Sequence, residues 1–204
     1  MKYFISLFVT SLLFIYSCDS NVDPQYKEPT NKITEGNTNA GGSVSSIINY
    51  DIIPLPERSP IYLDSVFSVT KSIIGEIGGH IALDRTYISN RGRLVTMLVN
   101  LTIPPNAFSG QRNITLTIDR DYAAVHCLPG MQFNLPLNLV QTFTGLDIQD
   151  YETEDIDFVY IRKNGTLEEV DRTAIVVNKL LGIVTVLDAK LNHFSRYGWV
   201  RKNQ

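Results

Sequence analysis

The sequence LVTMLVNLTIPP, at residues 94–105, decides the fold of this 204-residue chain. Its first ten residues are dominated by aliphatic and β-branched side chains, which is typical of a β-strand. Two prolines then end the run, because proline donates no backbone hydrogen bond to a neighbouring strand. A second stretch, NITLTID at residues 113–119, alternates strictly, so that Ile114, Leu116 and Ile118 share one face of a strand.

The same kind of pattern continues from about Val66 to the end of the chain. Short β-branched runs alternate with glycine, proline, asparagine and aspartate, and no segment keeps a helical period for three turns. One helical turn is expected at residues 105–108, and Pro136 implies an edge or a bulge in its strand. Many short strands favour an antiparallel sandwich or barrel, and we predict an all-β antiparallel β-sandwich. Further strands are expected at residues 123–128, 135–143, 157–161, 174–177 and 183–187, with turns at 163–165 and 178–182.

The first eighteen residues have the layout of a bacterial lipoprotein signal. Met1-Lys2 is a short basic end, residues 4–16 are apolar, and Ser17 precedes Cys18. The apolar run is too short for an ordinary membrane span. We therefore expect cleavage before Cys18, which would carry acyl chains such as palmitate and hold the protein on a membrane. An ordinary secretory leader and an uncleaved anchor are the alternatives.

This layout divides the chain into four parts. Residues 1–17 are the expected signal peptide, and residues 18–45 a lipidated, disordered tether with a reach of roughly 30 Å. Residues 46–65 form an extended lead-in whose state the sequence leaves open, and residues 66–204 form the β-sandwich. The expected location is the bacterial cell envelope, with the outer membrane favoured over the inner one.

Charge and cysteine content narrow the partners. The formal net charge of −3 indicates no nucleic-acid partner. The chain has two cysteines, so lipidation of Cys18 leaves Cys127 without a partner for a disulfide. Cys127 lies in an apolar strand-like run, which predicts a buried and unreactive thiol.

Five phrases of the sequence, taken in order, carry a family resemblance. GEIGGHIAL at residues 75–83, LTIPPNAF at 101–108 and FNLPLNL at 133–139 come first, followed by the hairpin at 160–170 and LNHFSRY at 191–197. Together they resemble the ZU-five domain family, the β-sandwich of ankyrins, netrin receptors and many bacterial surface proteins. In the hairpin, Leu167 or Glu168 stands in place of the family's aromatic residue. The resemblance implies a binding or scaffolding module that has no cofactor and is not an enzyme.

The tripeptide His193-Phe194-Ser195 is the sharpest candidate for chemistry. In autoproteolytic domains of nucleoporins and adhesion receptors, the same tripeptide cleaves itself between phenylalanine and serine. The Ser195 hydroxyl would attack the Phe194 carbonyl while His193 takes the proton, and a strained peptide bond would supply part of the driving force. The structural alternative is a closing strand, with Phe194 in the core and Tyr197 and Trp199 over an edge.

Two further groups contain residue types that bind metal ions in proteins, but only the first is a candidate site. The acidic loop at residues 147–157 offers clustered carboxylates for calcium, although its spacing fits no EF-hand, and a solvated loop is the competing interpretation. His80, His126 and His193 have no metal-ligand spacing and are expected to be structural. His126 and Cys127 are neighbours on a strand and point to opposite faces.

These observations lead to one principal function and two alternatives. We expect a lipid-anchored, non-catalytic β-sandwich that binds or scaffolds an unidentified protein or glycan of the envelope. The first alternative is a module that cleaves itself at Phe194-Ser195. The second is a carbohydrate-binding module, in which exposed rings would stack on sugars. The rings available for this are Tyr62, Tyr87, Tyr122, Tyr151, Tyr197 and Trp199.

Overall fold

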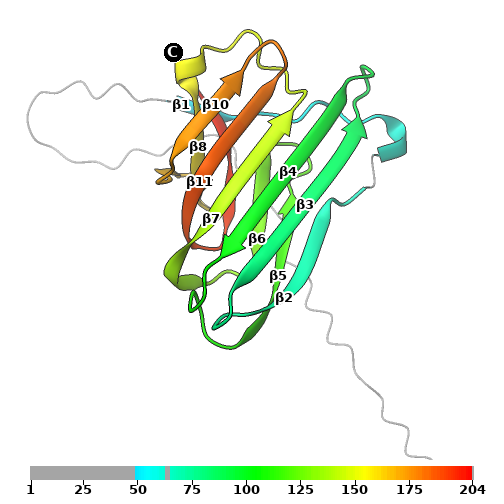
Figure 1. Ribbon diagram of the computed structural model, residues 1–204. Coiled ribbons are helices and arrows are strands. Elements are labelled where there is room, and N and C mark those ends of the chain that lie inside the picture. Colours follow the sequence, from blue (N-terminus) through cyan, green and yellow to red (C-terminus); the bar gives the residue numbers. More distant parts are fainter. Residues whose placement is uncertain (1–48, 63–64, 204) are drawn as a thin grey trace, which may run out of the picture.

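Two antiparallel β-sheets face each other and bury one apolar core between them (Figure 1). This computed structural model describes residues 49–62 and 65–203. The all-β sandwich predicted from the sequence is confirmed. The expected signal peptide, Cys18 and the expected tether lie outside the described residues. Within the described part of the chain, neither short helix has the length and apolar character to cross a membrane.

Residues 49–62 and 65–203 form twelve strands and two short 3-10 helices. The strands of the seven-stranded sheet are β1 (Asn49–Ile52), β2 (Ser68–Ile74), β5 (Gln111–Ile118), β6 (Ala124–Leu128), β8 (Ile156–Ile161), β9 (Leu167–Glu169) and β12 (Arg196–Asn203). The strands of the five-stranded sheet are β3 (Gly79–Ile88), β4 (Leu94–Ile103), β7 (Gln132–Thr144), β10 (Ala174–Asn178) and β11 (Ile183–His193). The 3-10 helices are η1 (Pro60–Tyr62) and η2 (Thr153–Asp155).

The order of strands places β12 inside the seven-stranded sheet. The sheet runs β2-β5-β6-β12-β8-β9, and the five-stranded sheet runs β10-β11-β7-β4-β3. β8 pairs along one edge of β12, while β6 and β1 share the other edge. β6 pairs with residues 196–198 and β1 with residues 200–203, so β1 continues the edge where β6 stops.

The two segments with the clearest strand patterns form β4 and β5, as predicted. In β4 the side chains of Val95, Met97, Val99, Leu101 and Ile103 are buried and alternate with more exposed positions. β5 buries its three predicted aliphatic residues in the same way. Pro136 lies in β7 beyond the last residue that pairs with β4, and on its other side the register with β11 shifts between Leu191 and His193. The predicted bulge is therefore present.

The sandwich begins earlier than the sequence predicted. The boundary expected at residue 66 lies within the fold, because β1 pairs with β12 and Ile53 donates a backbone hydrogen bond to Trp199. The segment after β1 also packs against the sandwich. The guanidinium of Arg58 lies 4.5 Å from the centre of the Phe67 ring, which secures this segment by a cation–π contact. Three prolines at residues 54–60 concealed this role, because they break the alternation that marks a strand.

Two local predictions were wrong. Residues 105–108 form a turn and bends rather than a helical turn, and Asn106 has a left-handed backbone angle, φ 67°. Tyr197 and Trp199 do not cover an edge: both side chains are buried in the core, where Trp199 meets Phe158 with ring centres 5.3 Å apart. Their strand, β12, pairs on both sides, so its inward side chains face the middle of the sandwich.

The seven-stranded sheet has apolar side chains on both of its faces. Phe158, Tyr197 and Trp199 join the core between the sheets, while their neighbours in sequence form a second cluster on the outer side. This second cluster consists of Ala124, Val159, Ile161 and Val200, with Tyr50, Ile52, Tyr122 and Leu167 packed against it.

Candidate binding face

The outer face of the five-stranded sheet carries rows of threonine and small aliphatic residues. One row joins Thr86, Thr96 and Thr144, and the next joins Asp84, Leu98, Thr142, Thr185 and Val176. A third joins Ala82, Asn100 and Val140. We call these three rows the threonine face.

Threonine hydroxyls on neighbouring strands bond to each other across this face. The Thr86 and Thr96 hydroxyls are 3.0 Å apart, as are those of Thr142 and Thr185. Asp84 is the one charged residue of the three rows. Because β-branched side chains are stiff, ordering them against a partner costs little conformational entropy. Depletion of charge is typical of the centre of a protein–protein interface.

His193, Phe194 and Ser195 form the bend between β11 and β12. Phe194 is buried and meets the Phe133 ring edge-on, with ring centres 4.7 Å apart. The His193 ring packs against Tyr160, with ring centres 4.4 Å apart. Its Nδ1 lies 3.3 Å from the Tyr197 hydroxyl, which donates a hydrogen bond to the His193 carbonyl oxygen at 2.7 Å. The imidazole is thus engaged by two tyrosines.

The backbone around the Phe194–Ser195 bond is held by ordinary hydrogen bonds. The Phe194 amide donates to Met131 at 2.8 Å, and the Ser195 carbonyl accepts from Cys127 at 2.7 Å. Among the described residues, the non-glycine positions with positive φ are Asn106 and Asp188, both outside the tripeptide. Within the same residues, no hydrogen bond joins the side chains of His193 and Ser195. The buried Phe194 agrees with the structural alternative for the tripeptide, although Tyr197 and Trp199 lie in the core and not over an edge. The capacity of the tripeptide to cleave itself stays a prediction.

The phrases that carry the family resemblance meet at one end of the sandwich. The Asn106 amide donates to the Gly75 carbonyl, and a Cβ on Gly75 would come 2.0 Å from the Phe108 carbonyl oxygen. Phe108 packs on Phe133, which in turn meets Phe194. These residue types therefore have a physical role here, which is to close the end of the sandwich.

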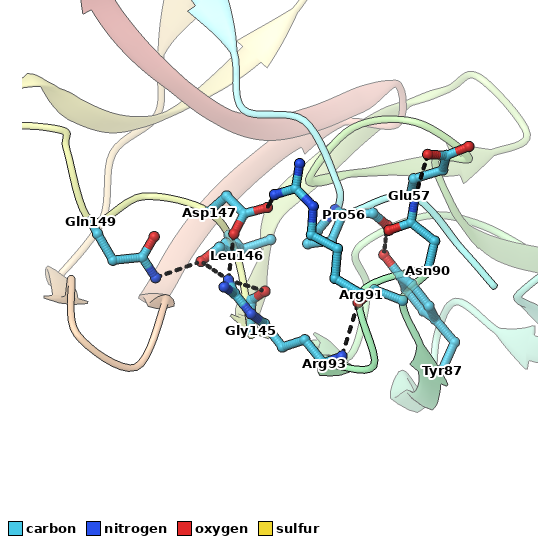
Figure 2. Close-up of polar contacts among 11 residues, drawn as sticks. Pro56, Glu57, Tyr87, Asn90, Arg91, Arg93, Gly145, Leu146, Asp147 and Gln149 are labelled. Carbon is cyan, nitrogen blue, oxygen red and sulfur yellow. Dashed lines mark hydrogen bonds and ion pairs between the residues drawn. The ribbon is translucent and has the colours of Figure 1, made fainter.

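The acidic loop is tied to cations of the chain itself. Figure 2 shows the side chains of Arg91 and Arg93 directed at Asp147, with Arg93 also donating to the carbonyl oxygens of Gly145 and Leu146. Farther along the loop, Glu152 pairs with Lys179 and Asp157 pairs with Arg172. In the described part of the chain, no group of three or more metal-ligating side chains is placed to hold an ion. Asp147, Glu152 and Asp157 each pair with a cation of the chain, so a structural role accounts for these three carboxylates.

Asp119 and Arg196 are buried on the seven-stranded sheet and form a polar cluster with the partly exposed His126. Asp119 Oδ2 lies 3.0 Å from Nε2 of His126 and 2.7 Å from a guanidinium nitrogen of Arg196, and its Oδ1 accepts two backbone amides. Burial by itself raises the pKa of Asp119, but the hydrogen bond from His126 and the charge of Arg196 outweigh it and hold this pKa below its ordinary value. Removing Asp119 or Arg196 would break a buried ion pair, which is costly.

Cys127 follows His126 in β6, and its side chain lies on the opposite face of that strand, as predicted. Its side chain is buried in the core, and burial raises the pKa of the thiol to about 12. The thiol is therefore unreactive, as the sequence indicated. His80 is exposed at the start of β3, far from the polar cluster in sequence.

The structure separates the six aromatic residues proposed for sugar binding. Tyr87, Tyr197 and Trp199 are buried in the core, and burial raises the pKa of Tyr87 to about 12. Tyr62 is half-buried and packs on Tyr87. Only Tyr122 and Tyr151 remain as partly accessible rings that share one pocket.

Comparisons with protein-family models, with curated proteins and with solved structures found no significant match.

Sequence reasoning missed the threonine face and the polar cluster. The threonine face was partly visible as alternating threonines within strands, but the residues of one row come from different strands. The polar cluster combines Asp119, which follows β5, with Arg196 of β12, and the two come together because β6 pairs with both strands.

Proposed function

We propose that this protein is a lipid-anchored, non-catalytic module of the bacterial envelope that binds another protein through its threonine face. Supporting the binding role, the face offers stiff, uncharged side chains on a rigid sheet. Its three rows contain no aromatic ring, which favours a protein over a sugar as the partner at this surface.

The observation that carries this proposal is the near absence of charge from the three rows of the threonine face. The opposite sheet differs, because the part of its outer side around β6, β8 and β12 is already filled by the second apolar cluster and the polar cluster. The five-stranded sheet thus has the outer surface that suits a partner better.

A matched pair of arginine substitutions tests the binding role. Thr142 and Thr115 are both half-buried and each bonds to a threonine on the next strand, but they lie on different sheets. We expect Thr142→Arg to abolish a cross-linked complex in intact cells while the melting temperature stays close to that of the unchanged protein. Thr115→Arg is the control and should leave the complex in place. Loss of the complex with both variants, or with neither, would contradict the proposal.

The lipid anchor rests on the sequence of the first eighteen residues. Mass spectrometry of the protein extracted from membranes should find Cys18 acylated at a new N-terminus, and Cys18→Ala should release the chain from the lipidated fraction. Fractionation then distinguishes the outer membrane, which we favour, from the inner one. An unmodified Cys18 in protein shed into the medium would exclude the anchor.

The non-catalytic part of the proposal concerns the bond between Phe194 and Ser195. Its flanking amides and carbonyls make regular hydrogen bonds, and His193 is held by Tyr160 and Tyr197. Denaturing electrophoresis should show one intact band after prolonged storage. A fragment ending at Phe194 that disappears in Ser195→Ala would establish self-cleavage instead.

A further inference from the structure

A pocket of about 320 Å³ lies where β1 meets β12. Asp51 and Ile53 come from β1 and the residue that follows it, and Arg201 comes from β12. Tyr122 and Tyr151, from two separate loops, complete the walls. The volume is at the lower end of the range for small-molecule sites and suits a ligand of about one sugar ring.

Asp51 and Arg201 supply the polar groups of this pocket. A guanidinium nitrogen of Arg201 lies 3.6 Å from a carboxylate oxygen of Asp51, and Asn203 donates to the same oxygen at 2.8 Å. The side chain of Asp51 is 46% exposed and that of Arg201 is 36% exposed, so both remain accessible to a ligand. The pair offers carboxylate acceptors and guanidinium donors side by side, which matches neighbouring hydroxyl groups.

The same pair selects against charged ligands. An anion drawn to Arg201 would be repelled by the carboxylate of Asp51, and a cation drawn to Asp51 would be repelled by the guanidinium. Because the two charges are close enough to compensate each other, a ligand that is neutral overall meets the smallest electrostatic penalty.

Aromatic and apolar side chains form the rest of the pocket. Tyr122 and Tyr151 are half-buried, Ile53 is 1% exposed at the base, and Pro54 lies at the rim. The guanidinium of Arg201 lies 4.4 Å from the centre of the Tyr151 ring, which fixes the position of both side chains. Rings of this kind pack against the C–H face of a sugar while hydroxyls reach the polar pair.

The geometry points to a binding site for a neutral sugar ring in this pocket, with Asp51 and Arg201 contacting hydroxyl groups and Tyr122 and Tyr151 packing against the ring. The site shares no residue with the threonine face, so a test of sugar binding does not depend on the protein partner proposed there.

Saturation-transfer NMR on the purified full chain tests the site, in a detergent without a sugar headgroup. The probes are glucose, galactose, mannose and N-acetylglucosamine, with glucuronate as the anionic comparison. We expect at least one neutral sugar to bind and glucuronate to bind more weakly than glucose. Asp51→Asn should weaken binding on the order of tenfold, because a charge-assisted hydrogen bond is lost. Tyr151→Leu should weaken it roughly threefold to tenfold.

Two control variants separate the pocket from general effects on the fold. Asp84→Asn removes an exposed carboxylate on the other sheet, and Tyr62→Leu removes a half-buried ring outside the pocket, so both should bind the sugar unchanged. Because Asp51→Asn conserves the shape of an accessible side chain, it remains informative even if Tyr151→Leu fails to fold. Absence of binding by all four neutral sugars, preference for glucuronate, or binding indifferent to Asp51→Asn would overturn the inference.

Discussion

The outer faces of the two sheets differ in what they bury. The threonine face of the five-stranded sheet has half-buried and exposed threonines and aliphatic residues, with Asp84 as its one charged member. The outer side of the seven-stranded sheet buries an apolar cluster around Val159 and Val200, together with the charges of Asp119 and Arg196. The threonine face is thus a surface, whereas the outer side of β8 and β12 is an extension of the core.

Because of this difference, we expect similar substitutions on the two sheets to have different effects. Substitutions in the second apolar cluster and the polar cluster of the seven-stranded sheet should act on stability, because they disturb buried groups. Substitutions on the threonine face should act on binding and leave stability nearly unchanged. The first two of the following measurements compare matched positions on the two faces, and the third follows Asp119 alone.

Removal of a buried charge should have the largest effect. Asp119→Asn removes the buried carboxylate that pairs with Arg196 and lies 3.0 Å from Nε2 of His126, and we expect the free energy of unfolding to fall by about 3 kcal/mol. Asp84→Asn, the matched change on the threonine face, should shift it by less than about 0.5 kcal/mol. Urea denaturation measures both variants. Equal losses would remove the distinction between the two faces.

A valine-to-threonine pair should give an intermediate effect. Val159 is 4% exposed in the second apolar cluster, whereas Val176 is 50% exposed on the threonine face. Val159→Thr buries a hydroxyl and should cost about 1–2 kcal/mol of stability. Val176→Thr should change stability by less than about 0.5 kcal/mol. Thermal unfolding followed by circular dichroism compares them, and a larger loss for Val176→Thr would reverse the assignment of core and surface.

Acid should produce the smallest of the three effects. The pKa of Asp119 is lowered in the folded protein from its ordinary value of 3.8, because His126 and Arg196 outweigh the opposite effect of burial. Its contribution to stability is therefore fully present above pH 3.8 and is lost as the pH falls through the lower, folded pKa. Urea titrations from pH 7 to pH 2 should show the difference between the unchanged protein and Asp119→Asn narrowing below that value. A difference that stays constant would show that protonation of this carboxyl is not linked to unfolding.

Local patterns predicted the strands that are apolar on one face only. β4 and β5 alternate between buried and exposed residues, so their inward sides could be identified from the sequence. β8 and β12 have buried residues on both faces, and nothing in their local sequences shows that both strands lie inside a sheet. That is why Tyr197 and Trp199 were expected at an edge although they lie in the core.

The candidate sites depend on contacts between distant segments. The threonine face joins residues of five strands, and the sugar pocket joins β1 near one end of the described chain to β12 at the other. Tyr122 and Tyr151 were among the six rings named from the sequence, but nothing local separates them from the buried Tyr87. Asp51 and Arg201 were missed because the register of β1 and β12 alone makes them neighbours.

Site-specific photo-cross-linking in living cells tests the central claim most directly. A photoreactive residue would replace Thr96 on the threonine face or Thr117 on the outer side of the seven-stranded sheet, both half-buried threonines within strands. The account predicts a discrete covalent protein adduct from position 96 and none from position 117. An adduct from position 117 alone, or from neither position, would contradict it.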